Sequence, residues 1–166
     1  RDNVLVELDR RPSLDVFIDE IGPNLAADLE RAGQTVHVAL TVPGSDQADY
    51  VVRNITAIDP NQGLIAIGDT IDTGQSLMFC IRNRDSAVAD LKRMTSEIRR
   101  RLGRPPRAGL YFSCVARGPN LFGQGSQEMG LITQSLGDFP IAGFYANGEI
   151  FNHRLYGYTG VLVLFP

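Results

Sequence analysis

Residues 141 to 151 read Ile-Ala-Gly-Phe-Tyr-Ala-Asn-Gly-Glu-Ile-Phe and carry the strongest local folding signal of the chain. Asn147 and Gly148 both accept a positive φ and are flanked by apolar residues, so the pattern predicts a β-hairpin that turns at this pair. The stretch belongs to residues 103 to 166, which hold 11 of the 17 glycines and 10 of the 13 aromatic residues but only seven of the 35 charged residues. A charged residue in such surroundings is therefore a better candidate for a functional role than a charged residue on a solvated helix.

Outward from this stretch, the pattern of apolar residues predicts the rest of the fold. Strands are expected at 109–115 and 158–165 and helices at 86–102 and 126–136. The first part of the chain predicts further strands at 4–8, 35–42, 50–58, 64–67 and 77–81, with helices at 13–21 and from Pro23 to Gly33. We therefore expect an α+β fold, a single domain with a mixed, largely antiparallel sheet and helices packed on it. Within this domain, residues 1–102 form a frame of strands and helices, and residues 103–166 form a glycine- and aromatic-rich motif region.

Length and charge exclude several classes of protein. A chain of 166 residues and 18.2 kDa can bury roughly 70% of its unfolded surface, which is enough for a core without disulfides or metal. A net charge of −3 does not favour nucleic-acid binding. The longest apolar runs fall far short of the roughly 20 residues that span a bilayer. Two cysteines without an apolar leader indicate free thiols and a cytoplasmic location. Because the chain starts at Arg1 and ends on an apolar strand-like run, we expect an N-terminal partner segment outside it.

Cys114 and Arg117 stand three residues apart at the end of a predicted strand. A nearby guanidinium lowers the pKa of a thiol, so Cys114 could be reactive. Neither histidine has a spacing that ties it to Cys114 as a base. The alternative is that Cys114 is a small buried core residue and Arg117 a structural ion-pair partner.

Glycines precede the predicted helix at 126–136, in the run Phe122-Gly123-Gln124-Gly125-Ser126. Free N–H groups at the start of a helix can hold an anion, which makes Gly118, Gly123 and Gly125 candidates for ligand contact. The run lacks the Lys-Ser/Thr ending of a nucleotide P-loop, so ATP and NAD are disfavoured. A flexible entry loop capped by Ser126 or Gln124 is the alternative.

Glu149 follows the predicted turn and is flanked by aromatic residues such as Tyr145. A carboxylate between aromatic walls suits an ammonium group or a hydroxyl-rich ligand, and a single exposed glutamate on a hairpin is the alternative. Together with Asn147, these residues predict a pocket at the end of the Cys114 strand. There Arg117 would hold the carboxylate and Glu149 the ammonium of a small zwitterion.

The sequence offers no assembled catalytic or metal site. Two histidines 116 residues apart, without a close cysteine pair, argue against zinc. No nucleophile elbow and no paired glycosidase-like carboxylates are found either, so we expect binding rather than catalysis. The ligand-binding residues we predict are Cys114, Arg117, Gly118, Gly123, Gly125, Tyr145, Asn147 and Glu149.

Three motifs resemble the C-terminal domain of the FIST family, the F-box and intracellular signal transduction proteins. They are Cys-Val-Ala-Arg-Gly at 114–118, Gly-Phe-Tyr-Ala-Asn-Gly-Glu-Ile at 143–150 and Tyr-Gly-Tyr-Thr-Gly-Val-Leu-Val-Leu at 156–164. The segment from Gly68 to Gly74 is also similar to the family's pattern. Many relatives carry His or Asn at the position of Tyr156, where this chain departs from the family, and His153 lies three residues away from it.

The resemblance implies a cytoplasmic, bacterial-type sensory domain that binds a small ligand such as an amino acid. It implies an N-terminal FIST half as partner and a histidine kinase, a cyclase or a chemoreceptor as output. Some members are similar to haem-binding nitric-oxide sensors, which would make His153 or His37 the axial ligand here. We expect no cofactor, and a haem sensor and a protein-interaction module without a small ligand remain the alternatives. A thiol enzyme would require His153 to lie near Cys114.

Overall fold

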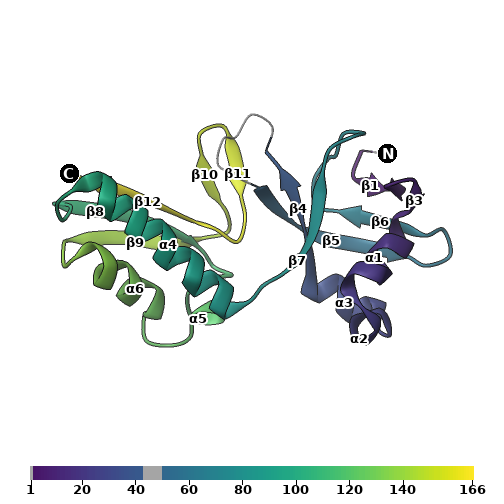
Figure 1. Cartoon of the computed structure of the whole chain (residues 1–166), viewed down its shortest axis with the longest axis horizontal. Coiled ribbons are helices and arrows are strands. Elements are labelled where there is room, and N and C mark those ends of the chain that lie inside the picture. Colours follow the sequence, from purple (N-terminus) through teal and green to yellow (C-terminus); the bar gives the residue numbers. More distant parts are fainter. Residues whose placement is uncertain (1, 43–49) are drawn as a thin grey trace. The chain divides into compact units, whose positions relative to one another are not determined.

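The computed structural model describes residues 2–42 and 50–166, and the chain divides into two compact units, Arg1–Ile81 (unit 1) and Arg82–Pro166 (unit 2). Both units combine helices with largely antiparallel strands, so the predicted α+β class is confirmed. The sequence leads us to expect one main sheet, whereas the structure has one main sheet in each unit (Figure 1). The long helix at 84–102 belongs to unit 2, so the change in composition near residue 103 falls inside that unit.

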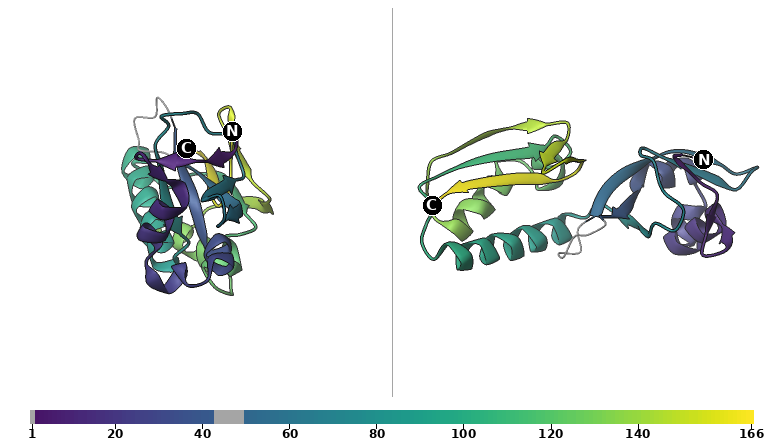
Figure 2. Two further views of the ribbon diagram at one scale, coloured as in Figure 1. Left: turned by 90° about the vertical axis from the view of Figure 1, so that its right-hand side faces the viewer. Right: turned by 90° about the horizontal axis from the view of Figure 1, so that it is seen from above.

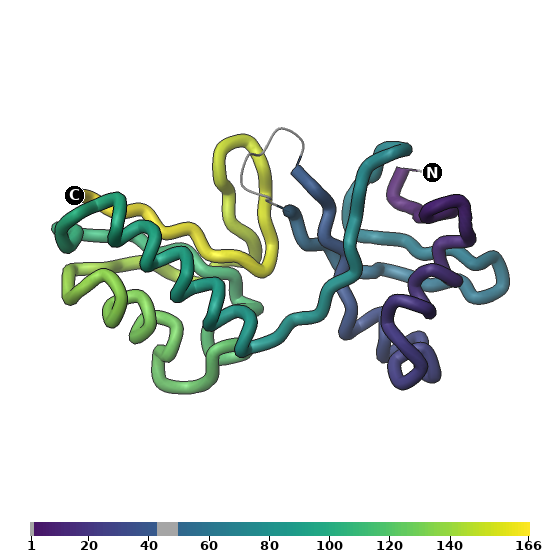
Figure 3. Tube along the Cα trace, viewed as in Figure 1, coloured from purple at the N-terminus to yellow at the C-terminus, as the bar shows by residue number. Residues whose placement is uncertain are grey.

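Unit 1 is a five-stranded antiparallel sheet in the order β1-β6-β5-β4-β7. The predicted strand at 4–8 is divided into two short strands, and the second pairs with a third short strand in a separate ribbon. The first and third of three helices contact the sheet, and the short second helix packs against both of them (Figure 3). Their apolar residues join Phe17, Val38 and Ile65 in one core. The elements are β1 (Val4–Leu5), β2 (Glu7–Leu8), β3 (Arg11–Pro12), α1 (Ser13–Ile21), α2 (Pro23–Ala26), α3 (Leu29–Thr35), β4 (Val36–Thr41), β5 (Tyr50–Asp59), β6 (Leu64–Ile67) and β7 (Leu77–Ile81).

Unit 2 has a three-stranded sheet in the order β12-β8-β9. Strand β8 pairs antiparallel with β12 and parallel with β9, which makes this sheet mixed. Helices α4 and α6 lie side by side on one face of the sheet (Figure 2). The elements are α4 (Arg84–Leu102), β8 (Ala108–Cys114), α5 (Gly118–Leu121), α6 (Gln127–Leu136), β9 (Ile141–Ala146), β10 (Glu149–Phe151), β11 (Arg154–Tyr156) and β12 (Gly160–Phe165).

The core of unit 2 fills the space between the sheet and the two helices. Leu91 of α4 and Ile132 of α6 meet Tyr111 of β8 there, together with Phe122 and Phe139. Alternation along a strand sends neighbouring side chains to opposite faces, so Leu110 and Phe112 point away from these helices. That outer face is only partly covered, since Leu110, Phe144, Val163 and Phe165 are exposed.

The predicted hairpin at Asn147-Gly148 is wrong. Strand β9 pairs with β8, and β10 pairs with β11, so the two strands on either side of Asn147-Gly148 are not partners. Gly148 has a φ of 122° and redirects the chain out of the sheet instead of folding it back onto β9. The hairpin that forms turns at Asn152-His153, where Asn152 takes the positive φ of 54° that its side chain tolerates.

Candidate functional site

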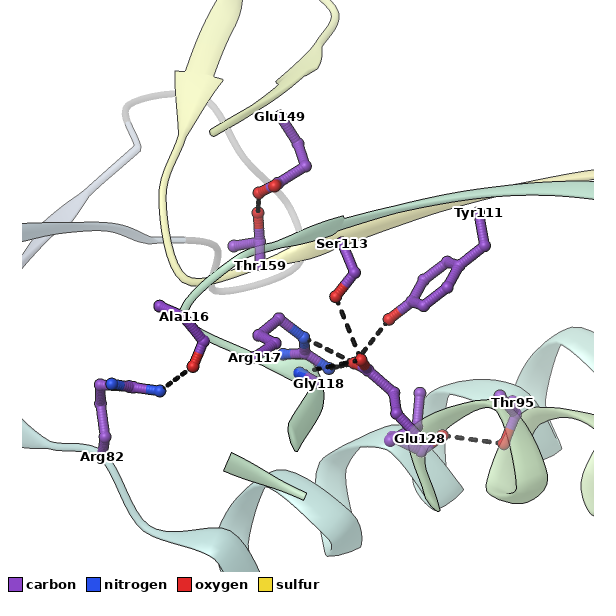
Figure 4. Close-up of polar contacts among 11 residues, drawn as sticks. Arg82, Thr95, Tyr111, Ser113, Ala116, Arg117, Gly118, Glu128, Glu149 and Thr159 are labelled. Carbon is purple, nitrogen blue, oxygen red and sulfur yellow. Dashed lines mark hydrogen bonds and ion pairs between the residues drawn. The ribbon is translucent and has the colours of Figure 1, made fainter. Parts of the chain in front are cut away.

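Glu128 is the centre of a polar cluster between the end of β8 and the start of α6. Its side chain is 2% exposed and accepts hydrogen bonds from the hydroxyl of Tyr111 at 2.7 Å and from that of Ser113 at 3.1 Å. The backbone N–H of Gly118 donates at 3.3 Å to Oε2 of Glu128, the same oxygen that accepts from Ser113. Figure 4 shows these groups converging on Glu128 from β8 and the turn that follows it. A buried charge in protein needs such compensation, and Glu128 receives it from each side.

Arg117 completes the cluster. Its Nε lies 2.8 Å and its Nη2 2.7 Å from Oε1 of Glu128, and its guanidinium lies 5.0 Å from the centre of the Phe122 ring. Burial lowers the pKa of Arg117, but its interactions with Tyr111 and Glu128 outweigh burial and raise this pKa above the ordinary value. The predicted binding residue Arg117 therefore directs two of its nitrogens to a carboxylate of its own chain.

Two tyrosine rings lie so close to glycines that no side chain fits between them. A Cβ on Gly118 would lie 2.5 Å from the hydroxyl oxygen of Tyr145, and a Cβ on Gly160 would meet the hydroxyl of Tyr111. Gly118 also has a φ of 48°. Burial raises the pKa of Tyr111, so this hydroxyl keeps its proton and donates it to Glu128. These close approaches restrict the ring of Tyr111 in the middle of β8 and that of Tyr145 near the end of β9.

Glu149 lies on the other face of the sheet end. Thr159 lies opposite Cys114, and the N–H of Cys114 donates to the carbonyl of Thr159 at 2.9 Å. The next pair along the strands is Ser113 opposite Gly160. Since successive residues face opposite sides, Thr159 and Cys114 point away from the Glu128 cluster. The hydroxyl of Thr159 donates to Oε2 of Glu149 at 2.7 Å, and Figure 4 shows this pair on the far side of the strand from Glu128.

The second oxygen of Glu149 is left open. The residue is 3% exposed, yet Oε1 is buried and accepts no hydrogen bond from any residue in 2–42 or 50–166. Burial raises the pKa of Glu149, and the hydrogen bonds of Thr159 and the charge of Arg117 oppose this effect without cancelling it. An unpaired buried acceptor costs about 1–3 kcal/mol, so Glu149 is held at a cost to the stability of the fold.

The remaining predicted residues are dispersed around these two carboxylates. Cys114 is buried and points to the same face of the sheet as Glu149. Asn147, two residues before Glu149 in the sequence, is exposed. Gly123 and Gly125 have positive φ in the loop before α6, and α6 begins after Ser126, whose side chain does not cap it. The acidic residue in the first turn of α6 is Glu128 itself, which faces the cluster.

One histidine and one cysteine are neighbours in unit 1, because His37 of β4 lies opposite Cys80 of β7, whereas His153 and Cys114 belong to unit 2. His37 is buried in the central part of the unit 1 sheet, whereas His153 is exposed in the turn between β10 and β11. Cys80 and Cys114 are both free thiols, as the sequence leads us to expect. Burial raises the pKa of Cys80. In the part of the chain that the structure describes, no three metal-ligating side chains come together.

Sequence reasoning missed Glu128, Tyr111, Ser113 and Thr159. Glu128 is one of the seven charged residues in the charge-poor region after residue 103, and that sparseness was the available signal. Its pairing with Arg117 joins residues 11 positions apart across a loop, which no local periodicity reveals. The hydroxyls of Tyr111 and Ser113 are recognisable only from alternation along β8, since both face the helices.

Two hollows on the molecule lie away from these residues. One, of about 690 Å³, is in unit 1 between the β2 and β7 segments and α1. The other, of about 570 Å³, is in unit 2 at the ends of α4 and α6 and includes Arg99, Arg100 and Arg104. Neither contains a predicted binding residue, so the candidate site rests on the contacts of Glu149 and Glu128.

Residues 14–152 match the model of the FIST C domain. The chain belongs to this family. The match confirms the resemblance found in the sequence. The FIST C domain is a sensory domain of signal-transduction proteins. The chain is 34% identical over 173 residues to an uncharacterized protein of Mycobacterium tuberculosis, a match that covers 98% of this chain and 44% of that protein. It is 33% identical over 177 residues to an uncharacterized protein of Mycobacterium bovis, covering 99% of this chain and 45% of the relative.

The FIST C chain thus spans less than half the length of these curated relatives. No solved structure is significantly similar to it. Within the described residues, no helix is long and apolar enough to cross a membrane.

Proposed function

We propose that this FIST C domain is a cytoplasmic, non-catalytic sensor that binds a small ligand beside Glu149. The observation that supports this proposal best is the buried Oε1 of Glu149, which no described residue satisfies. An acceptor in this state is ready for a donor such as an ammonium group, which would supply both a hydrogen bond and an opposite charge. Glu128 offers no such opening, because its oxygens already accept bonds from four residues of the chain.

The same arrangement supports a route for the signal. Thr159 hydrogen-bonds Glu149 and directly precedes β12, and the N–H of Cys114 in β8 donates to Thr159. A ligand that moves Glu149 would therefore displace the end of the β8–β12 pair. We propose a histidine kinase, a cyclase or a chemoreceptor as the output partner that responds.

Thermal-shift measurement against a library of amine-containing metabolites tests the proposal. A compound present at about 100 times its dissociation constant should add roughly 2.7 kcal/mol to the free energy of unfolding. The stabilisation should disappear in Glu149→Gln and persist in Arg104→Gln, an exposed arginine in the same unit. A library without a single stabilising compound, or equal stabilisation of Glu149→Gln, would contradict the proposal.

The outer face of the unit 2 sheet favours a second function, binding of another protein segment. Phe144 is 65% and Val163 40% exposed on this face, on which neither α4 nor α6 lies. Contiguous exposed apolar side chains are typical of interaction surfaces. More than half of each curated relative lies outside the matched segment, and we propose an N-terminal FIST half as the occupant. Phe144→Lys and Val163→Lys should then abolish co-purification with that half, and unchanged co-purification would refute it.

A further inference from the structure

The hairpin of β10 and β11 carries a second buried charged group with an atom that has no hydrogen-bond partner among the described residues. Nε of Arg154 is buried, and it donates no hydrogen bond to any residue that the structure describes. Arg154 also forms no ion pair within residues 2–42 and 50–166. A buried guanidinium nitrogen without an acceptor is as costly as a buried carboxylate oxygen without a donor. The hairpin is only three residues long on each strand, yet it holds both of these groups.

Arg154 and Glu149 face the same side of the hairpin. Glu149 is the partner of Tyr156, and Phe151 is the partner of Arg154. Partners in an antiparallel pair share a face, and so do residues two apart on one strand. Glu149 and Arg154 are therefore diagonal neighbours on this face, where Cα atoms lie about 7–8 Å apart. Ile150 and Leu155 point to the opposite side and are largely exposed.

Opposite charges at this spacing can pair directly, but in this structure they do not. Each keeps one buried atom, Oε1 of Glu149 and Nε of Arg154, without a hydrogen-bond partner among the described residues. The face between them also carries Tyr156 and the half-exposed ring of Phe151. A molecule with an ammonium and a carboxylate a few bonds apart would satisfy both groups at once. A guanidinium holds a carboxylate through a planar pair of N–H donors, and the aromatic rings would contact the apolar part of the molecule.

We propose that Glu149 and Arg154 form the two ends of a zwitterion site on one face of the β10–β11 hairpin. Glu149 accepts from the ammonium, and Arg154 donates to the carboxylate. Arg117 is not part of this site, because its Nε and Nη2 are directed at Glu128. The inference rests on the proposed function, in which Glu149 binds a cationic group, and adds the class of ligand and the residue that recognises its second charge.

Calorimetric titration of the 166-residue chain with the twenty common amino acids tests this site. For each compound that binds, the methyl ester removes the carboxylate charge and the N-acetyl derivative removes the ammonium charge. We expect at least one free amino acid to bind and its N-acetyl derivative to bind at least tenfold more weakly. Arg154→Gln should weaken binding of the free amino acid at least tenfold and leave binding of its methyl ester within a factor of two. Arg104→Gln should change neither.

The outcomes separate the two proposals. Binding that Glu149→Gln abolishes and Arg154→Gln leaves unchanged would overturn the zwitterion site and keep the proposed function. Equal weakening of the free acid and the ester by Arg154→Gln would also overturn it, since Arg154 would then act without recognising a carboxylate. If no amino acid binds, the zwitterion site is overturned, and the amine library decides the proposed function separately. Circular dichroism of each variant establishes that the loss of binding is not a loss of fold.

Discussion

Unit 2 contains two buried glutamates with opposite environments. Glu128 faces the helices, and its carboxylate accepts bonds from Tyr111, Ser113, Gly118 and Arg117. Glu149 faces away from that cluster, and among the described residues Thr159 is the one whose side chain donates to it. Both are almost without solvent contact, at 2% and 3% exposure. The difference teaches that burial alone does not mark a functional carboxylate. Glu149, which has an oxygen without a hydrogen-bond donor among the described residues, is the candidate for binding. Glu128, whose two oxygens both accept hydrogen bonds, is structural.

Removing the charge of Glu128 should have the largest effect. Glu128→Gln leaves the guanidinium of Arg117 buried without its counter-charge, and breaking a buried pair in this way costs about 3–5 kcal/mol. Urea unfolding followed by tyrosine fluorescence measures this cost, because four of the five tyrosines lie in unit 2 and the chain has no tryptophan. A loss below about 1 kcal/mol would show that the cluster does not hold the unit together.

Tyr111→Phe should have a smaller effect in the same direction. It removes one donor from the Glu128 carboxylate while the ring remains against Gly160. Hydrogen bonds to charged groups contribute about 1.5–3 kcal/mol, and we expect a loss of this size. The same urea titration tests it. A loss as large as that of Glu128→Gln would place the stabilisation in the tyrosine rather than in the carboxylate.

Thr159→Val sharpens the comparison from the side of Glu149. The substitution keeps the shape of the side chain and removes the hydroxyl that donates to Oε2. The pKa of Glu149, already raised by burial, should rise further, and stability at neutral pH should fall by about 0.5–1.5 kcal/mol. Carboxyl chemical shifts of Glu149 recorded against pH report the change in pKa. A pKa that falls or stays constant would contradict the assigned hydrogen bond.

Glu97→Gln provides the smallest effect and the matched control. Glu97 pairs with Arg101 one turn along α4, and the side chains of Arg101 and Glu97 are 62% and 39% exposed to solvent. Such pairs contribute about 0.3–0.5 kcal/mol, and the variant should be nearly as stable as the wild type. If urea unfolding shows a loss as large as that of Glu128→Gln, then the effect at Glu128 does not depend on burial.

The sequence predicted the fold class and most helices, because their apolar periodicity is local. The helix at 84–102 and the strand at 108–114 are found within two residues of their expected bounds. The Asn147-Gly148 hairpin failed because strand pairing is decided by long-range contacts: β8 outcompetes β10 as the partner of β9. Glu149 was singled out from its charge-poor surroundings, and the structure buries it with one oxygen that no described residue satisfies. The sequence did not predict the Thr159 hydrogen bond to Glu149, the Glu128 cluster or the unsatisfied Nε of Arg154. These features depend on which face of a strand each side chain occupies, and the wrong hairpin prediction gave the wrong faces.

The burial of Glu149 also predicts how the stability of the fold responds to pH. The pKa of Glu149 is raised above its ordinary value of 4.5 in the folded chain. An acid of this kind ionises more readily in the unfolded chain, so its ionisation destabilises the fold as pH rises from the ordinary value through the raised one. Glutamine carries no such penalty. The advantage of Glu149→Gln over the wild type should therefore be small near pH 4 and largest at about pH 8.

The most direct test of the account is the free energy of unfolding of Glu149→Gln relative to the wild type, measured by urea titration at pH 4 and pH 8. We predict that the variant is at least as stable as the wild type at pH 8 and that its relative stability declines toward pH 4. A loss of 3 kcal/mol or more at pH 8, the size expected for Glu128→Gln, would show that Glu149 is a structural residue like Glu128 and would contradict its assignment as the open end of a binding site.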